Sequence, residues 1–496
     1  MGGVQSGLSV GEIASVEWAG RSPATTYEWY VNVTNGSTTV RSETWNFTTA
    51  GDLFPHVVLN SPSSLEVFDS SSVQFNCTAS DDYNLTNVTL YVDGSPVEWN
   101  ASGVEGDYTF TRMLSEGFHS WSCEVTDNAS QSTRPAAVGF SVDLSAPGIA
   151  FQGQTLPDGA STSDRWVEAN VSINDTSLDS FTWNWDGSNV TLFNDSLVLM
   201  YNFDNVSALG EGDSYIVDVS GEGNHIGSGE MFGTPEWTSD GWYGGAWNFS
   251  GDDRFEIADS DLPDSFPCKD GTGNCNITIS LWVKLESYNN DFVCKGPSTG
   301  TWCLWNPSNG HLREGVSDTE SSVNISLNEW THVAMTHNGT DVVLYINGSI
   351  VASSYDNGGF PDVDDSFEIG DTGSPANGLM DEIRIYDRGL SHDEVQTLYV
   401  SNLRKYDPDS WEFYVNQSKN STAPLDWGDY SYQAFASDAT GLSNSTEERN
   451  VSVVDTPPSV SLASPLDGSG LNSTGVLFNC SVSDNVNVSN VTLYVD

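Results

Sequence analysis

The chain has 496 residues, enough for about three to five domains, and its 37% apolar and 11% aromatic residues can supply packed cores. Its 69 acidic and 16 basic residues give a formal net charge of −53. This charge excludes nucleic acid and anionic membranes as partners, because both would be repelled. The acidity suits a calcium-rich exterior or high salt, and equally an acidic secreted surface without special purpose.

Targeting signals are absent from the sequence itself. No apolar run approaches the roughly eighteen residues of a membrane span, and no basic-then-apolar leader opens the chain. We therefore expect an internal fragment of a longer extracellular protein of the cell surface. Asn-x-Ser/Thr sequons also favour a glycoprotein, although each alone suits a strand edge or turn. Examples are Asn32, Asn76, Asn87, Asn170, Asn248, Asn347, Asn416 and Asn490.

The first 143 residues contain alternating apolar patterns that predict β-strands. Residues 1–50 resemble the C-terminal half of a fibronectin type III module, with Tyr27 as the corner tyrosine. Residues 54–143 resemble an immunoglobulin-like sandwich, with Cys77 and Cys123 in alternating strands. The resemblance implies a Cys77–Cys123 disulfide. Trp121 at the tyrosine corner and Tyr91 at the usual core tryptophan depart from the antibody pattern and favour a distant surface module.

The same module recurs along the chain. Residues 73–81 match residues 476–484, and residues 87–93 are identical to residues 490–496. Such repetition indicates tandem modules, of which residues 457–496 are a truncated copy. Cys480 corresponds to Cys77, so its partner would lie beyond residue 496.

A third copy is interrupted. Residues 167–175 and 181–187 align with the first module, and the alignment resumes only at residues 428–434. In this copy Val171 and Ala434 replace both disulfide cysteines, as expected if the two positions face each other in one core. We therefore predict that residues 147–195 and 404–455 form one immunoglobulin-like domain that is split by an insert.

The insert, residues 197–403, has the pattern of another β-sandwich. Residues 276–285 and 330–335 alternate as half-buried strands, and Asn347-Gly348 predicts a hairpin turn. Ser391 and Glu394 form a capping box for a short helix. With residues 201–204, 218–225, 244–249, 367–370 and 378–399, these motifs resemble the laminin-G-like branch of the concanavalin A-like lectin/glucanase family. The resemblance implies a two-sheet jelly roll with neighbouring first and last strands, and the whole chain is expected to be all-β.

Four cysteines of the insert allow three connectivities. We favour Cys268–Cys275 across a glycine-rich loop and Cys294–Cys303 across a hairpin. Metal ligation is the rival interpretation, but no Cys-x-x-Cys spacing or nearby histidine pair supports it. Disulfides again indicate an oxidising, external compartment.

The resemblance implies two candidate sites in the insert. A calcium ion could lie near the paired terminal strands, where Asp204 and Asp381 would approach each other, although solvated loop carboxylates are an equally good interpretation. The additional candidate ligands are Asp218, Asn224 and Asp252. A glycan could stack on aromatic side chains in or beside loops, although packing is their commoner role. These aromatic residues are Trp237, Trp242, Tyr243, Tyr288, Trp302 and Trp305.

Catalysis is not expected. The insert lacks the paired carboxylates on one strand that glycanases of this family use, and Glu368 and Glu382 stand alone in structural motifs. We therefore predict a surface adhesin whose insert binds a glycan or a cell-surface protein. A structural stalk or envelope protein without a specific ligand is the alternative, and a glycan-acting hydrolase is the remote one.

Overall fold

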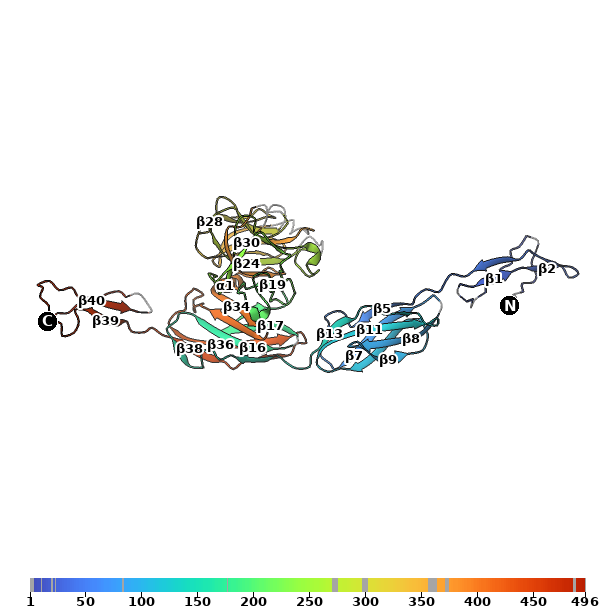
Figure 1. The fold of residues 1–496 in the computed structure, drawn as a ribbon, viewed down its shortest axis with the longest axis horizontal. Helices are drawn as coiled ribbons and strands as arrows, with labels where there is room; N and C mark the ends of the chain where they lie inside the picture. Colours follow the sequence, from blue (N-terminus) through green and yellow to red (C-terminus); the bar gives the residue numbers. More distant parts are fainter. Residues whose placement is uncertain are drawn as a thin grey trace. The chain divides into compact units, whose positions relative to one another are not determined.

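The computed structural model describes residues 4–9, 11–18, 21–22, 24–82, 84–175, 177–269, 275–296, 302–355, 364–370, 374–484 and 488–495. The chain forms two compact units, Met1–Ser145 and Ala146–Asp496. Antiparallel sheets dominate both units, as the all-β prediction requires (Figure 1). Among the described residues, no helix is long and apolar enough to cross a membrane.

The first unit begins with two small strand pairs. Strand β1 (Thr26–Trp29) pairs with β4 (Trp45–Thr48), and β2 (Asn32–Thr34) pairs with β3 (Thr39–Arg41). Tyr27 accepts a hydrogen bond from the backbone of Ser22 through its hydroxyl oxygen, at 2.7 Å. Its ring stacks on Phe47 at a centroid distance of 5.7 Å. These contacts link the tyrosine to its own segment of the chain.

An immunoglobulin-like sandwich completes the first unit. One sheet has the order β10-β7-β5, and the other has the order β6-β13-β11-β8-β9, with β12 paired to β11. The bounds are β5 (His56–Ser61), β6 (Val67–Phe68), β7 (Ser72–Ser80), β8 (Leu85–Val92), β9 (Ser95–Asn100), β10 (Gly106–Met113), β11 (Gly117–Asp127), β12 (Ser132–Thr133) and β13 (Val138–Val142). The Cys77–Cys123 disulfide joins the two sheets through the core. The Trp121 indole donates to the carbonyl of Pro62, which satisfies its buried N–H.

In the second unit, a sandwich is assembled from strands that precede and follow the insert. We call this sandwich the host. Its two sheets have the orders β14-β16-β35-β34 and β15-β38-β36-β17-β18, with β37 paired to β36. The bounds are β14 (Gly148–Phe151), β15 (Ala160–Thr162), β16 (Val167–Asn174), β17 (Leu178–Trp185), β18 (Ser188–Phe193), β34 (Ser401–Asp407), β35 (Ser410–Val415), β36 (Gly428–Asp438), β37 (Ser443–Ser445) and β38 (Arg449–Val453).

The host core is apolar at the positions of the lost disulfide. Val171 of β16 and Ala434 of β36 are both fully buried in one hydrophobic cluster. Trp183 also lies in this cluster and stacks on Phe413 at a centroid distance of 4.8 Å. Aromatic packing therefore stabilises this copy of the module where the first copy has a cross-link.

The insert is a two-sheet jelly roll. Its larger sheet has the order β21-β22-β33-β24-β29-β30-β31, with β19 paired to β33, and the smaller sheet has the order β20-β23-β32-β25-β26-β27-β28. The strands of the larger sheet are β19 (Leu197–Tyr201), β21 (Glu236–Thr238), β22 (Ala246–Phe249), β24 (Ile277–Leu285), β29 (Thr331–His337), β30 (Asp341–Ile346), β31 (Ser349–Tyr355) and β33 (Gly378–Tyr386). Those of the smaller sheet are β20 (Met231–Phe232), β23 (Arg254–Ile257), β25 (Asn290–Lys295), β26 (Trp302–Asn306), β27 (His311–Glu314), β28 (Glu320–Asn324) and β32 (Phe367–Ile369).

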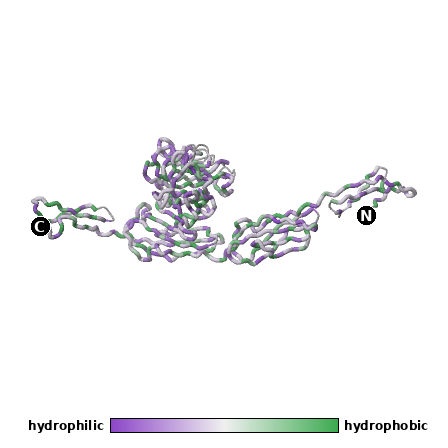
Figure 2. Tube along the Cα trace, in the orientation of Figure 1, coloured by the Kyte–Doolittle hydropathy of each residue, from purple (hydrophilic) through white to green (hydrophobic). Residues whose placement is uncertain are grey.

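Hydrophilic and hydrophobic residues are interspersed along the chain (Figure 2). In strands such as β23 polar and apolar residues alternate, so that Phe255 and Ile257 point to the core. The predicted face of β24, with Ile277, Ile279, Leu281 and Val283, lies in that core. First strand β19 pairs with last strand β33, as the resemblance implies. The turn at Asn347-Gly348 has positive φ at both residues, 49° and 70°, the conformation of a type I′ hairpin. Disulfides join Cys268 to Cys275 and Cys294 to Cys303, the favoured pairs.

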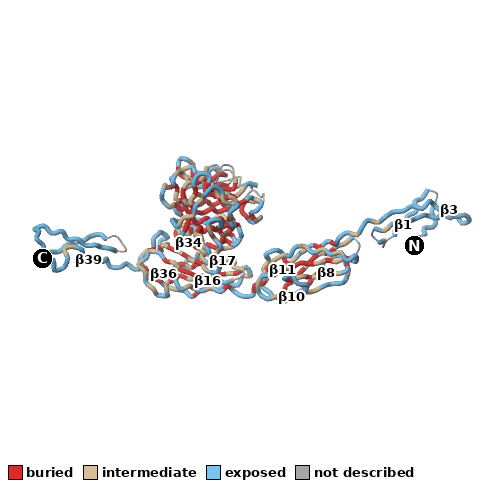
Figure 3. Tube along the Cα trace, in the orientation of Figure 1, coloured by how far each residue is buried: buried red, intermediate tan, exposed pale blue. Residues whose placement is uncertain are grey.

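A few short elements complete the chain. Two 3₁₀ helices, Ser207–Leu209 and Asp259–Asp261, lie in loops of the insert. Strands β39 (Ser459–Ser464) and β40 (Asn479–Ser483) pair near the C-terminus, where Cys480 is exposed and unpaired. This strand pair is exposed (Figure 3), and its exposed residues include the apolar Val460, Leu462 and Val482.

Helix α1 (His392–Val400) follows β33 and leads directly into β34 of the host (Figure 1). The predicted capping box is present: the Ser391 hydroxyl accepts from the Glu394 backbone, and the Glu394 carboxylate accepts from the Ser391 backbone. Val395 and Leu398 form its buried face. The partly buried ring of Tyr399 stacks on Trp282 of the larger sheet, at a centroid distance of 5.7 Å.

The host core continues through α1 onto the outer face of the insert. One cluster of buried residues contains Trp183 of the host, Leu398 of the helix and Tyr345 of β30. Along β30, Tyr345 alternates with Leu344 and Ile346, which lie in the jelly-roll core. The larger sheet is thus buried on both faces where α1 covers it. Host and insert therefore share one packed interface.

Replacing Leu398 by alanine tests this shared packing. Removing a buried leucine costs about 2–5 kcal/mol. We expect Leu398→Ala to lower the melting temperature of both the host and the insert, because both pack on the same helix. Hydrogen exchange in β17 and β24 reports the two bodies separately. Asp393→Asn, on the exposed side of α1, is the matched control and should cost less than about 1 kcal/mol. Destabilisation confined to one body would contradict the shared core.

Candidate functional site

The six aromatic residues predicted for glycan binding do not lie together. Trp302 is fully buried in the jelly-roll core, and Trp305 lies on β26 beneath Arg313, whose guanidinium carbon is 5.3 Å from its ring centroid. Tyr288 is half-buried and donates its hydroxyl to the carbonyl of Ile325 at 3.1 Å. These three residues have structural partners. Trp237, Trp242 and Tyr243 line grooves.

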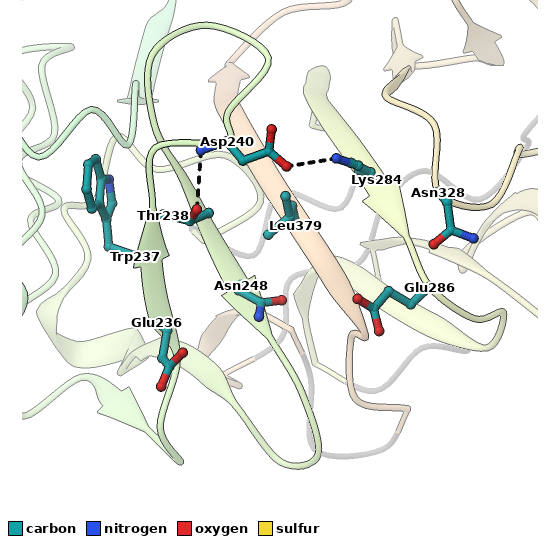
Figure 4. Close-up of a pocket in the computed structure, with 9 residues that line it drawn as sticks. All are labelled: Glu236, Trp237, Thr238, Asp240, Asn248, Lys284, Glu286, Asn328 and Leu379. Atoms are coloured by element: carbon teal, nitrogen blue, oxygen red, sulfur yellow. Dashed lines mark hydrogen bonds and ion pairs between the residues drawn. The ribbon is translucent and has the colours of Figure 1, made fainter.

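The first groove lies across β21, β22, β33 and β24 on the larger sheet (Figure 4). It has a volume of about 390 Å³, and most of its lining is polar. The lining residues are Glu236, Trp237, Thr238, Asp240, Asn248, Lys284, Glu286, Asn328 and Leu379. The Trp237 indole donates to the carbonyl of Phe203 at 2.7 Å, and Lys284 pairs with Asp240 at 2.9 Å. We call this the sheet groove.

The second groove lies where the insert meets the host, and we call it the junction groove. Its volume is about 230 Å³. The insert contributes Trp242, Tyr243 and Gly244, and the host contributes Glu168, Asn402, Arg404, Glu412 and Tyr414. Neither body alone contains all of these side chains. The residues of the host half lie outside the insert sequence, and no motif in the sequence marks them as neighbours of Trp242 and Tyr243.

Aromatic rings form a continuous row at the junction groove. Trp242 stacks on Trp282 at a centroid distance of 4.2 Å, and Tyr243 packs on Tyr414 at 5.1 Å. Tyr414 in turn stacks on Trp166 of the host at 5.6 Å. Trp242 is 41% exposed and Trp166 is 40% exposed, so both indoles present apolar surface to solvent.

The turn that carries Trp242 and Tyr243 is held by buried carboxylates. Both backbone N–H groups donate to Asp381 Oδ2, at 2.8 and 3.1 Å. The N–H of Gly245 donates to Asp204 Oδ1 at 2.8 Å. Gly244 has φ +67°, and a Cβ there would collide with the Asp204 carboxylate, so glycine is required. The acids thus position the aromatic turn.

A β-bulge places two acids side by side on the outer face of β33. Ser280 of β24 is opposite Arg384, but Trp282 is opposite Asp381, so β33 has one extra residue. That residue, Glu382, has φ +53°, a left-handed conformation that is uncommon for glutamate. Strict alternation along β33 would separate Asp381 and Glu382, which is why the sequence pattern did not reveal their pairing.

Asparagine and arginine side chains satisfy Glu382 at the junction. Asn202 and Asn402 donate to its two oxygens, at 2.8 and 2.7 Å. Arg384 donates to Glu382 at 3.1 Å and to the carbonyl of Leu403 at 2.9 Å. Burial raises the pKa of Glu382 to about 7, although the Arg384 charge lowers it. The network connects β33 of the insert to β34 of the host.

On the host side of the groove, Glu412 pairs with Arg404, as Glu382 pairs with Arg384 on the insert side. Arg404 and Glu412 are opposite each other on β34 and β35, with N–O distances of 2.6 and 2.9 Å. Arg404 also approaches Asp204 at 3.5 Å. Burial raises the pKa of Glu412 to about 7 despite the Arg404 charge, and a hydrogen bond that the protonated Glu412 carboxyl donates to Glu168 adds to the rise.

The predicted calcium ligands lie in different places. Burial raises the pKa of Asp381, and the charges of Glu382 and then Asp204 raise it further, so Asp204 and Asp381 lie near each other. Asp218 instead accepts from the backbone of Met200, Ser220 and Asn224, so it holds its own loop together.

The remaining two candidate ligands also lie apart from Asp381. Asn224 donates its side-chain amide to the carbonyl of Val198 at 2.8 Å. Asp252 is exposed, and it is the neighbouring Asp253 that is buried and hydrogen-bonded.

Whether a calcium ion fits beside Asp381 depends on the number of oxygen ligands that the surrounding residues offer. Asp381 Oδ1 is buried and has no hydrogen-bond partner among the described residues, so it could serve as a ligand. Asp204 is the second carboxylate, but Arg404 already neutralises it in part. Calcium takes six to eight oxygens. Backbone carbonyls and water would have to supply the others.

Comparisons with known proteins place both kinds of domain in families. Residues 249–396 match the laminin G model of the concanavalin A-like lectin/glucanases superfamily. Residues 55–122 match the model of bacterial Ig domains. The chain therefore contains a concanavalin A-like domain and an immunoglobulin-like domain. No curated protein matches the chain.

Several solved structures are similar to parts of the chain. Domain 4 of AbnA, a GH43 extracellular arabinanase from Geobacillus stearothermophilus, in complex with arabinotriose, is 25% identical; the match covers 41% of this chain and 98% of that one, with a TM-score of 0.31. Trypanosoma rangeli sialidase is 13% identical, with 75% and 77% covered and a TM-score of 0.35. The binding domain of Botulinum Neurotoxin DC in complex with SialylT is 12% identical, with 58% and 78% covered and a TM-score of 0.30.

The raised pKa of Glu412 predicts a pH dependence of stability. The folded state keeps this proton up to about pH 7, whereas an unfolded glutamate releases it near pH 4.5. The contribution to stability is therefore complete below about pH 4.5 and is lost as the pH rises through 7. Glu168→Gln removes the neighbouring charge, so we expect the melting temperature to fall less between pH 5 and pH 8, by about 2–4 °C.

Melting curves of the variant and the wild type at both pH values measure this difference. Glu448→Gln, an exposed change in the same module, is the control and should leave the pH dependence as it is. Identical pH profiles for Glu168→Gln and the wild type would show that the two carboxylates do not interact.

Proposed function

We propose that the chain is part of an extracellular, non-catalytic glycan-binding protein, an adhesin whose junction groove holds a sugar. The observation that supports this most is the pair of exposed indoles, Trp166 and Trp242, beside hydrogen-bonding groups. Apolar sugar faces stack on aromatic rings, while hydroxyls need donors and acceptors such as Asn402, Arg404 and Glu412. The sheet groove is the weaker candidate, because Trp237 is its single aromatic residue.

The charges of the junction groove favour a neutral glycan. Among the described residues, Arg404 is the one basic residue in its lining, and it already pairs with Glu412 and Asp204. Glu168 adds a further carboxylate. A sialylated or uronate-containing glycan would place its own carboxylate among these acids, which costs free energy. A hydroxyl-rich neutral sugar avoids this cost.

The arrangement of the groove carboxylates supports binding rather than hydrolysis. Retaining glycosidases hold two carboxyl groups about 5–5.5 Å apart, and inverting enzymes hold them about 6.5–9.5 Å apart. Glu168 and Glu412 are in hydrogen-bond contact instead. Carboxyl groups in direct contact match neither of these separations. We therefore propose that this pair is not catalytic, and reducing-sugar release would overturn that.

Glycan-array binding of the whole chain tests the function. We expect Trp242→Ala and Trp166→Ala each to weaken binding about 30-fold, the effect of losing about 2 kcal/mol from an aromatic contact. Trp427→Ala is the matched control, because this indole is also about 40% exposed on the host but lies outside the groove lining. It should leave binding unchanged.

The outcomes separate the candidate functions. Equal losses from all three variants would argue against the junction groove. A change at Trp237 that abolishes binding would move the site to the sheet groove. An array without hits for the wild type would favour the structural stalk or a protein partner on the cell surface.

We also propose calcium as a structural ion beside Asp381, because that carboxyl group is buried and one of its oxygens has no hydrogen-bond partner among the described residues. Equilibrium dialysis with calcium measures the number of ions bound. Asp381→Asn keeps the acceptor for the aromatic turn but removes the charge, so we expect one ion fewer. Asp252→Asn, an exposed acid of the same domain, should bind the wild-type number. Equal binding by all three proteins would exclude this site.

A further inference from the structure

A three-carboxylate cluster lies at one end of the first immunoglobulin-like sandwich, in the first unit. Asp52 belongs to the segment before β5, Asp81 directly follows β7, and Asp127 is the last residue of β11. One carboxylate oxygen of each lies within 4.8 Å of the others. The three residues come from distant parts of the sequence, so the fold itself brings their charges together.

One oxygen in the cluster has no hydrogen-bond partner. Asp127 is 1% exposed, and its Oδ1 accepts from the backbone N–H of Gln131 at 2.8 Å. Its Oδ2 is buried and has no hydrogen-bond partner among the described residues. A buried carboxylate oxygen without a donor is costly unless a cation neutralises it. Asp127 Oδ2 therefore has the chemistry of a cation ligand.

The same arrangement recurs in the host, at the corresponding position. Asp438 is the last residue of β36, as Asp127 is of β11, and it is 2% exposed. Its Oδ1 accepts from the backbone of Thr440 and Leu442, at 2.9 Å each. Its Oδ2, like that of Asp127, is buried without a described partner. Two modules with different sequences thus share the unpartnered oxygen.

The protein supplies little positive charge to the cluster. Among the described residues, no lysine or arginine forms an ion pair with Asp52 or Asp127. Gln131 donates its amide to Asp52 at 3.2 Å, which is a neutral contact. Partial burial and then the charge of Asp127 raise the pKa of Asp52. The three acids destabilise one another unless a cation binds.

We propose that Asp52, Asp81 and Asp127 bind a calcium ion. All three are hard oxygen ligands, and the cluster contains no cysteine or histidine that would favour zinc. Calcium tolerates irregular coordination geometry and binds monodentate or bidentate carboxylates together with water. Three carboxylates at the surface end of a sandwich match this requirement better than the strict octahedron of magnesium.

Calcium binding would tie the linker to the sandwich. Asp52 lies in the segment between β4 and β5, whereas Asp81 and Asp127 belong to the ends of core strands. A shared ion would therefore order the residues around Asp52. Asp455 and Asp484 repeat the sequence spacing of Asp52 and Asp81, so the copy of the module that begins at residue 457 carries the same pair of acids. Calcium would thus control linker flexibility in a tandem array.

Hydrogen–deuterium exchange of the whole chain, with calcium or with EDTA at about 0.15 M salt, tests the proposal. We expect calcium to slow exchange in three segments, residues 50–56, 81–86 and 127–131, at least several-fold. Asp52→Asn and Asp127→Asn should each abolish this protection. Both variants keep a side-chain oxygen for hydrogen bonding, and in EDTA they should be at least as stable as the wild type, because like-charge repulsion is relieved.

The controls distinguish a built site from diffuse binding to the acidic surface. Asp69→Asn changes an exposed acid of the same module and should keep the protection. Asp381→Asn should also keep it, which separates this site from the one proposed in the insert. Absence of calcium protection in the wild type, or its persistence in Asp52→Asn, would overturn the site. Equal protection by magnesium would overturn the assignment to calcium. If Asp127→Asn fails to fold, Asp52→Asn alone decides, because Asp52 lies outside the core strands.

Discussion

The packing of helix α1 between two β-sandwiches determines how the second unit is built. The helix ends the jelly roll and delivers the chain to β34, which must reach β35 for the host sheet to form. Its buried residues Val395 and Leu398 belong to the same apolar cluster as the host core and the outer face of the larger sheet. A sheet with one solvated face would expose polar residues there. Instead β29 and β30 present Ala334 and Tyr345 to the helix.

This packing brings charged side chains together at the junction of host and insert, where neither hydrophobic core is complete. Burying ion pairs rarely adds stability, but removing one partner from a buried pair is costly. Glu382 and Arg384 are therefore supported by two asparagine amides and a backbone carbonyl. The carboxyl group of Asp381 accepts hydrogen bonds from the backbone of Trp242 and Tyr243 and so holds their turn in place. The candidate binding surface is thus a consequence of the insertion and belongs to neither domain alone.

Local patterns were sufficient to predict much of the fold. The alternation of β24, the Asn347-Gly348 turn and the capping box at Ser391 depend on nearby residues, and the structure contains all three. The all-β class and both domain families follow from such motifs. The concerted loss of two cysteines is matched by the burial of Val171 and Ala434 in one cluster.

The site could not be predicted in the same way, because it depends on tertiary packing. Trp302 and Trp242 look alike in sequence, yet one is in the core and the other is exposed. Asp218 and Asp381 both follow short apolar stretches of sequence, but backbone donors satisfy Asp218, whereas Asp381 has an oxygen without a hydrogen-bond partner among the described residues. The bulge at Glu382 and the contribution of Glu412 from the host required the folded chain. A residue type alone does not reveal which neighbours it will meet.

Native-state hydrogen exchange tests most directly whether insert and host form one cooperative body. The relevant amides lie in β17, an interior strand of the host sheet, and in β24, the middle strand of the larger sheet of the insert. Regions that unfold together exchange with the same opening free energy. We predict that the slowest amides of both strands agree within about 1 kcal/mol and shift together with denaturant. A difference of more than about 3 kcal/mol, with β24 remaining protected while β17 opens, would contradict the shared core.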